Sequence, residues 1–322
     1  MASDVTVPNP PPDPPETVHM EADDYASKKL NAGDLLWHYA RDFNGLNGIL
    51  KGELWASSLP YLNDTQEFRY GVHAILDALG MLLESGEHAR AILSFLEENL
   101  VVRYKPHDLF SISFSTQEDD LSQWRAYSGV NGPSFSVGFD PKELEFHANG
   151  YLFELHEVKY EASLVAADVK QELQQQIDDL NATIRAQKSA SVPIEFARNQ
   201  AAALTGPILQ MAPRYKHPKF SAEKEWRLIR WQPVIARTPR LPRRYRLSGS
   251  LVVPYIAMPL HTPLSEAAVY GGAKHASSPM RAITIGPSVH SDELKYAIED
   301  MTARSGLALI EVKPSAVPFR NW

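Results

Sequence analysis

The sequence contains no cysteine. The chain therefore has no disulfide, no thiolate zinc site and no cysteine nucleophile, and the lack of disulfides favours a cytoplasmic location. No apolar run approaches the roughly 18 residues that a membrane span needs. The N-terminus also lacks the charged and apolar regions of a signal peptide. We therefore expect a soluble, intracellular protein with no membrane partner.

An excess of positive charge is missing as well. The net charge is −7, from 32 Lys and Arg against 39 Asp and Glu. A protein that holds nucleic acid through its phosphates usually presents a basic surface, so general nucleic-acid binding is not expected. A local exception is a run of arginines, which forms either a basic groove or a solvated loop. The run comprises Arg237, Arg240, Arg243, Arg244 and Arg246.

The common catalytic signatures are also absent. The sequence has no G-x-G-x-x-G after a strand, no G-x-x-x-x-G-K-[ST], no H-E-x-x-H and no G-x-S-x-G. The 11 histidines are scattered without the spacing of metal ligands. His147 and His156 lie near carboxylates and could bind a metal, but ordinary surface histidines are the favoured explanation. We therefore predict no metal site.

The organisation of the chain is that of a proline-rich tail before one folded domain. Residues 1–33 include "VPNPPPDPPE", which favours an extended, solvated tail or linker. The alternative is a ligand for a proline-binding module. Residues 34–322 contain enough apolar patterning for a single domain, and residues 162–212 predict a helical insertion rich in Ala, Gln and Leu.

Short apolar or alternating segments predict that the domain is β-rich, with helices between the strands. Predicted helices cover 43–50, capped by Asp42 and stopped by Gly52, then 67–101 with a break near "ESGEH", 169–187 and 291–306. The fold class is therefore α+β. Strands are predicted at 35–39, 53–58, 108–116, 133–140, 151–160, 222–231, 250–260, 282–286 and 308–312.

Two carboxylates are candidates for chemistry. Glu223 and Glu225 flank Lys224 at the start of the predicted strand 222–231, so strand alternation predicts that both lie on one face together with Arg227. If they share a partly buried cleft, their repulsion raises the pKa of one of them, which suits acid–base work. The alternative is that Glu225 pairs with Arg227 and serves only the fold.

A histidine and a tyrosine complete the set of candidate site residues. His38 ends the first predicted strand, and Tyr127 lies on a short predicted helix close to Trp124. Each of these residues has a purely structural alternative, because hydrogen-bonded core histidines and buried tyrosines are common. The turn with Asn63, Asp64 and Glu67 either caps the next helix or lines the same cleft.

The segment "LLWHYARDFNGLNGILKGELWAS", residues 35–57, resembles the opening of ADP-ribosyltransferases of the diphtheria-toxin and poly(ADP-ribose) polymerase type. In that family a strand ending in His precedes a helix and an I-L-x-x-G-L turn, and a tyrosine and a catalytic glutamate follow. His38, Tyr127 and Glu225 occur in this H-Y-E order. About residues 35–320 also resemble a bacterial domain-of-unknown-function family grouped with ADP-ribosyltransferase-like folds. The shared motifs are "HYA", "GILKGELWASS", "YLND", "QWRAYSG", "EKEWRLI" and "ITIGP".

The resemblance implies a fold and a set of roles. The fold would be a split β-sandwich of two small antiparallel or mixed sheets with flanking helices. The substrate would be NAD, and ADP-ribose would pass to a macromolecular acceptor, protein or nucleic acid, in a toxin or phage-defence effector. Glu225 would stabilise the ribose cation and Glu223 would orient the acceptor. His38 would bind the ribose, and Tyr127, with Trp124, would stack on the nicotinamide.

The chain departs from both branches of this family. Tyr39 stands where the polymerases have glycine, beside the cofactor. Ser113 and Ser115 in "SFST" resemble the serine–threonine strand of the arginine-class toxins, as Glu223-Lys224-Glu225 resembles their E-x-E pair. Three alternatives remain open: an NAD glycohydrolase, a non-catalytic nucleotide-sensing or protein-interaction module, and an RNA 2′-phosphate-processing enzyme.

Overall fold

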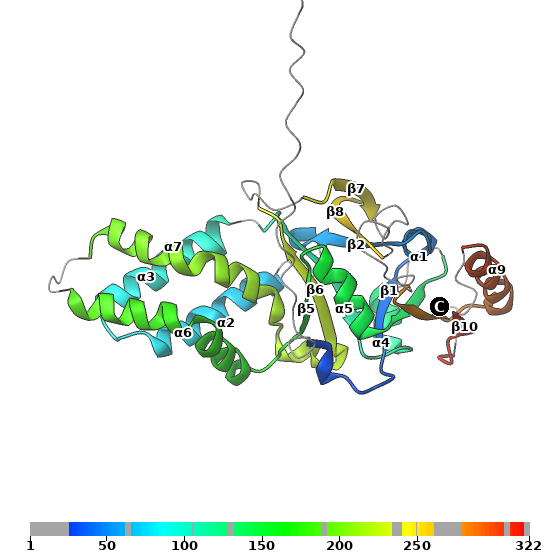
Figure 1. The fold of residues 1–322 in the computed structure, drawn as a ribbon, viewed down its shortest axis with the longest axis horizontal. Helices are drawn as coiled ribbons and strands as arrows, with labels where there is room; N and C mark the ends of the chain where they lie inside the picture. The colour runs from blue at the N-terminus through cyan, green and yellow to red at the C-terminus, as the bar shows by residue number, and fades with distance from the viewer. Residues whose placement is uncertain are drawn as a thin grey trace, which may run out of the picture.

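The strands assemble into one mixed, open sheet, and four of the described α-helices gather at one side of it (Figure 1). The structure is a computed structural model. The α+β class expected from the sequence is confirmed. No helix among the described residues is long and apolar enough to cross a membrane. The structure describes residues 26–61, 66–104, 106–127, 132–187, 192–233, 240–248, 250–260, 278–305 and 310–318.

Within the described residues the sheet has ten strands, with the order β10-β9-β4-β1-β3-β2-β8-β7; β6 pairs with β3, and β5 pairs with β6. Among these strands β9 and β10 pair in parallel, and the other pairs are antiparallel. The strands are β1 Leu36–Ala40, β2 Glu53–Ser58, β3 Leu109–Ser115, β4 Phe135–Phe139, β5 Glu154–Glu157, β6 Glu225–Trp231, β7 Arg243–Ser248, β8 Leu251–Pro259, β9 Met280–Ile285 and β10 Glu311–Pro314.

The sheet divides at β3. One edge of β3 pairs with β6 along its whole length, from Leu109 to Ser115. The other edge is shared, because β2 pairs with its beginning, at Phe110 and Ser111, and β1 with its end, at Ser115. A strand has only two edges, so β1 and β2 lie on the same side of β3 and separate from each other there. The central residue of this division is Ser113.

The helical side is a layer of four helices, α2 Gln66–Leu82, α3 Glu87–Glu97, α6 Ala162–Ala186 and α7 Ile194–Met211. Their apolar faces share one buried cluster, which includes Ile75, Ile92, Val169 and Leu204. The predicted helix 67–101 is broken where expected, and its last part, Glu98–Arg103, is a π-helix. The segment 162–212 therefore packs on helices from 66–97 and shares their hydrophobic core.

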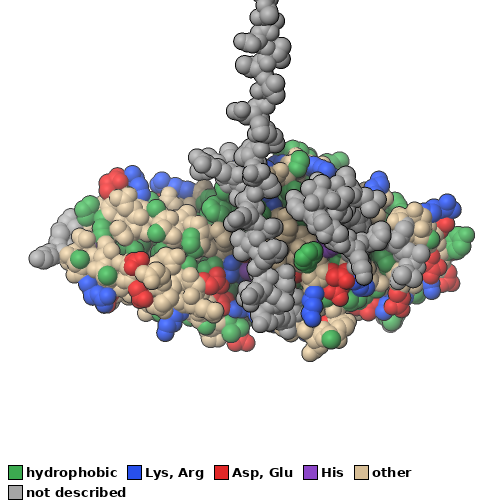
Figure 2. Space-filling view, viewed as in Figure 1, with side chains coloured by type: hydrophobic (Ala, Val, Ile, Leu, Met, Phe, Trp, Pro, Cys, Tyr) green, Lys and Arg blue, Asp and Glu red, His purple; other side chains and the backbone are tan. Residues whose placement is uncertain are grey.

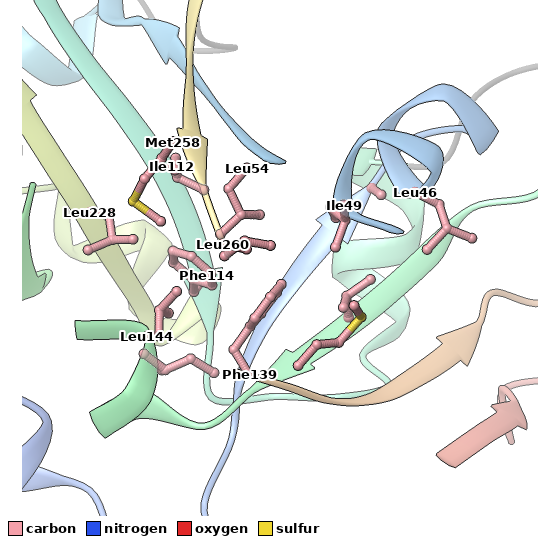
Figure 3. Packing of buried hydrophobic residues seen from close by; sticks show 14 of the residues in the cluster. Leu46, Ile49, Leu54, Ile112, Phe114, Phe139, Leu144, Leu228, Met258 and Leu260 are labelled. Atoms are coloured by element: carbon pink, nitrogen blue, oxygen red, sulfur yellow. The ribbon is translucent and has the colours of Figure 1, made fainter. Parts of the chain in front are cut away.

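Shorter helices lie against the sheet: α1 Phe43–Leu50, α4 Leu121–Tyr127, α5 Pro141–Gly150 and α9 Ser291–Arg304. As predicted, the side chain of Asp42 caps α1 by accepting from the Gly45 N–H at 3.0 Å. Gly52 follows α1 with a φ of 85°, a left-handed conformation that favours glycine. Figure 3 shows Phe114 of β3, Leu228 of β6 and Leu144 of α5 gathered in the core of the sheet.

Three predictions need correction or lie beyond the described residues. The arginine run, which the sequence left as groove or loop, contains an edge strand, β7. The strand predicted over 222–231 begins only at Glu225, because 218–223 forms a 3-10 helix. Residues 1–25 and 306–309, which include most of the proline-rich tail and the start of the last predicted strand, lie outside the described residues.

Candidate functional site

A cleft of about 740 Å³ opens where β1 and β2 separate. Its walls come from α1 and from strands β1, β2, β3, β6, β7 and β8, and Lys216 reaches it from the segment before β6. Charged side chains of both signs are interspersed over the described surface in Figure 2. The predicted residues that line the cleft are His38, Tyr39, Ser113, Ser115, Glu223 and Glu225, joined by Glu67.

His38 spans the division of the sheet. Its Nδ1 lies 2.9 Å from the Ser113 carbonyl oxygen. Because that oxygen can only accept, Nδ1 carries the hydrogen and Nε2 is the acceptor nitrogen of the neutral ring. Burial lowers the pKa of His38, which keeps the ring neutral at pH 7. The histidine therefore contacts the Ser113 carbonyl at the point where β1 and β2 separate, and it presents a hydrogen-bond acceptor beside the cleft.

Glu225 is the first residue of β6 and is only 4% exposed. Its Oε1 accepts from Arg227 Nε at 2.7 Å, and its Oε2 accepts from Arg227 Nη2 at 2.8 Å and from Lys216 Nζ at 3.1 Å. The Ser113 hydroxyl also hydrogen-bonds this carboxylate. Burial by itself would raise the pKa of Glu225, but Arg227 and Lys216 outweigh it and hold the pKa at about 2. Glu225 is therefore ionised at neutral pH.

Two more carboxylates complete the cluster. Lys216 Nζ lies 2.7 Å from Glu67 Oε1 and 2.7 Å from Glu223 Oε2, and Arg227 Nη2 donates to Glu67 Oε2 at 2.5 Å. With all five groups ionised, three carboxylates face two cations, so the cluster carries one net negative charge. Burial raises the pKa of Glu223, and the neighbouring Glu225 adds to this effect while Lys216 opposes it.

The two glutamates of E-K-E come together differently from the prediction. Lys224 has a φ of 44°, so the chain turns sharply between Glu223 and Glu225. The expectation that strand alternation places both on one face of a strand is wrong, because Glu223 belongs to the 3-10 helix Pro218–Glu223. They meet through a shared cation, Lys216, and one of them does have a raised pKa, as predicted.

Ser115 and Tyr39 hold the turn that follows β3. The Ser115 hydroxyl donates to the Glu223 carbonyl at 2.8 Å and accepts from the Gln117 N–H at 3.1 Å. The Tyr39 hydroxyl lies 2.9 Å from the Gln117 and Glu118 carbonyls and accepts from the Asp120 N–H at 3.2 Å. Both side chains therefore shape the cleft wall chiefly by anchoring its backbone.

Trp124, one of the two aromatic residues predicted to stack on the nicotinamide, does not line the cleft. Trp124 is 3% exposed, and it is not among the residues that line the cleft. Its Nε1 donates to Asp119 Oδ1 at 2.6 Å, and the Tyr39 ring packs edge-on against it with 4.8 Å between centroids. Trp124 is thus a core residue. Tyr127 ends α4, and its side chain, like residues 63 and 64 (Asn63 and Asp64), lies outside the described part of the chain.

The cleft also contains residues that the sequence analysis did not place with the candidate site residues. Trp55 of β2 and Tyr255 of β8 line the cleft with their ring centroids 5.0 Å apart, and Arg244 and Arg246 reach it from β7. The two-residue spacing of these arginines is a strand signal that the density of charge obscured. Lys216 carries no such signal, because its place in the cluster depends on contacts from three separate segments.

The donor set of the cleft does not suit a metal ion. Its three carboxylates are each engaged by Lys216, and two of them also by Arg227. Among the described residues, no group of three or more His, Asp or Glu side chains is arranged to hold a metal. The described cleft therefore offers hydrogen-bonding and ionic groups for an organic ligand.

Comparison with known proteins gives one match. Residues 123–228 match a family model described as "Protein of unknown function (DUF2971)". The matched segment runs from α4 to β6 and includes Glu223 and Glu225, while His38 lies before it. No curated protein and no solved structure matches the chain. The expected resemblance to a domain of unknown function is thereby found over 123–228.

Proposed function

We propose that the protein is an NAD-dependent ADP-ribosyltransferase with an ADP-ribosyltransferase-like fold, and that its cleft binds NAD and cleaves the bond to nicotinamide. One observation carries the proposal. The division of the sheet brings His38 from β1, Ser113 from β3 and Glu225 from β6 to one cleft, although they lie far apart in the sequence. The cleft volume of about 740 Å³ is in the range typical of small-molecule sites.

Cleavage of the bond between ribose and nicotinamide is favoured by negative charge beside the sugar. Cleavage of an N-glycosidic bond passes through an oxocarbenium-like transition state with positive charge on the ribose. Glu225 remains ionised at neutral pH, and its cluster retains a net negative charge, which favours that transition state. A carboxylate has about four acceptor positions. In this proposal the ribose 2′-hydroxyl takes the place of the Ser113 hydroxyl as a donor to Glu225.

The neighbouring groups would position the substrate. His38 would accept a hydrogen bond from a ribose hydroxyl through Nε2, because Nδ1 is already committed to the Ser113 carbonyl. Glu223 has the raised pKa that suits a general base, so it would receive the proton of the acceptor nucleophile. The paired rings of Trp55 and Tyr255 would provide the flat wall that Trp124 does not.

A non-catalytic nucleotide-binding module is the second candidate. The observation that favours it is the extensive pairing of Glu225, whose two oxygens already accept from Arg227 and Lys216. A glutamate held in this way can serve the fold without acting on a substrate. The two candidates share a ligand class and differ in whether the glycosidic bond breaks.

The test is to incubate the purified protein with NAD and to quantify nicotinamide, free ADP-ribose and ADP-ribosylated acceptor by mass spectrometry, with and without cell extract. The proposal predicts nicotinamide release, with the ADP-ribose mass on an acceptor. Glu225→Gln should lower the rate by about 10²–10³-fold, by analogy with loss of a donor that stabilises transition-state charge. The matched control is Glu98→Gln, an exposed glutamate paired with Arg103 on the helical side.

Three outcomes decide among the candidates. Free ADP-ribose in place of modified acceptor would indicate a glycohydrolase, with water taking the place of the acceptor. NAD binding without nicotinamide release, in every condition, would overturn the enzyme and leave the binding module. Equal rates for the wild-type protein and a folded Glu225→Gln variant would remove Glu225 from the mechanism.

A further inference from the structure

Arg246 is a cleft-lining cation separate from the two that pair with the glutamate cluster. It belongs to the edge strand β7, where it pairs with Val253 of β8. Its Nη2 donates to the Ser57 hydroxyl of β2 at 2.9 Å, so the side chain crosses β8 to reach the next strand. The guanidinium therefore lies against the sheet and lines the cleft.

This arginine forms no ion pair among the described residues. No described carboxylate lies within 4 Å of it, and its Nε is shielded from solvent without a hydrogen-bond partner in the described structure. Arg227 and Lys216, the other shielded cations of the cleft, each contact carboxylates directly. A shielded charge without an ionic partner is energetically costly. The Arg246 guanidinium is therefore expected to pair with an anion that a ligand supplies.

The surroundings of Arg246 strengthen this point. Burial lowers the pKa of Arg246, and the charge of Arg41 adds to this effect, while Asp42 opposes it. The Asp42 carboxylate is occupied as the cap of α1. Arg244, on the same strand, is already neutralised by Glu53, with both carboxylate oxygens within 2.9 Å. Of the two arginines of β7 that line the cleft, Arg246 is therefore the one left to meet a ligand.

The position of Arg246 relates it to the rest of the cleft. Its charge contributes to the lowered pKa of His38, so the two side chains are close enough to interact. Ser57, which it contacts, pairs with Tyr255 across β2 and β8, and Tyr255 packs against Trp55. A cation and a pair of aromatic rings thus stand together in one wall of the cleft.

We propose that Arg246 binds a phosphate or diphosphate group, and that the cleft is a site for a nucleoside diphosphate. A guanidinium presents its N–H groups as a planar fork that matches two phosphate oxygens, and the Arg246 guanidinium lines the cleft. The rings of Trp55 and Tyr255 offer the adjoining flat surface for the base. This inference rests on the proposed function, since NAD contains the same diphosphate, and it deepens that function by naming the residue that holds this group.

The experiment is titration calorimetry of the full chain with ADP, adenosine and inorganic pyrophosphate at low salt. ADP should bind the wild-type protein at least tenfold more tightly than adenosine, and pyrophosphate should compete with ADP. Arg246→Gln should weaken ADP binding at least tenfold while leaving adenosine binding unchanged. Arg246→Lys keeps the charge and loses the planar fork, so its affinity for ADP should lie between those of the wild-type protein and Arg246→Gln.

Arg243→Gln is the matched control, because Arg243 is an exposed arginine of the same strand that donates to the His107 carbonyl and does not line the cleft. It should bind ADP within twofold of the wild-type protein. Equal ADP affinity for the wild-type protein and Arg246→Gln, both with native circular dichroism, would overturn the inference. So would equal affinities for ADP and adenosine, or failure of ADP to bind at millimolar concentration.

The outcome is separable from that of the proposed function. ADP binding that depends on Arg246, without nicotinamide release from NAD, would support this inference and overturn the transferase. If Arg246→Gln released nicotinamide at the wild-type rate and bound ADP with the wild-type affinity, the transferase would be supported and this inference overturned.

Discussion

Acidification should expose the contribution of Glu225 to folding. The pKa of this carboxyl is about 2 in the folded protein, against an ordinary value of 4.5. Each unit of difference corresponds to about 1.4 kcal/mol, so the ionised, paired carboxylate contributes about 3 kcal/mol above pH 5. The unfolded chain binds the proton first as the pH falls. The stability is therefore present above pH 4.5 and is lost progressively as the pH falls from there towards 2.

The assay is urea unfolding followed by circular dichroism at several pH values between 7 and 3. Other carboxylates also titrate in this range, so the informative quantity is the difference between the wild-type protein and Glu225→Gln. The variant should be less stable at pH 7 by about 3–5 kcal/mol, because Arg227 and Lys216 lose a buried partner. This gap should narrow by about 2 kcal/mol between pH 5 and pH 3.

The surface variant Glu98→Gln provides the comparison, since its exposed pair with Arg103 contributes at most about 1 kcal/mol. A gap between the wild-type protein and Glu225→Gln that stays constant from pH 7 to pH 3 would refute the reasoning. It would mean that Lys216 and Arg227 do not hold the carboxylate ionised.

Three further predictions concern the walls of the cleft. Gly48→Ala should lower the free energy of unfolding by about 1–3 kcal/mol, measured by thermal or urea unfolding, because the added Cβ would lie 2.8 Å from the Trp55 ring. An unchanged melting temperature would contradict this packing. Asp42→Ala should cost about 1 kcal/mol by the same assay through loss of the α1 cap, and restoration by Asp42→Ser would support that cause. Trp124→Phe should lower the free energy of unfolding by about 1 kcal/mol, because the hydrogen bond from Trp124 to Asp119 is lost. ADP affinity measured by calorimetry should not change, because Trp124 does not line the cleft. Weakened ADP binding in a stable variant would show that Trp124 contributes to the site.

The sequence predicts the strands best where apolar alternation is bounded by turn residues. Strand β2 has the predicted bounds, 53–58, and β1, β3, β4 and β8 lie within one or two residues of theirs. Strand β7 was left open as a groove or loop because its composition is dominated by arginine. An edge strand with little buried surface does not need apolar residues, so its pattern is weak in any single sequence.

The site is only partly readable from the sequence. His38, Ser113 and Glu225 can be singled out because each occurs in a motif on a predicted strand. The sharp turn at Lys224 cannot, since a non-glycine residue in a left-handed conformation leaves no compositional signal. The place of Lys216 between three carboxylates depends on the tertiary arrangement of α2, the 3-10 helix Pro218–Glu223 and β6. The burial of Trp124 has the same origin, because Asp119 and Tyr39 surround it only in the folded chain.

The most direct test of the central claim is a crystal structure of the protein with NAD or its cleavage products bound. The account predicts ligand density in the cleft between β1 and β2, with the nicotinamide ribose within about 3 Å of both His38 Nε2 and the Glu225 carboxylate. A dinucleotide bound on another face of the protein, or a ribose that contacts neither side chain, would contradict it.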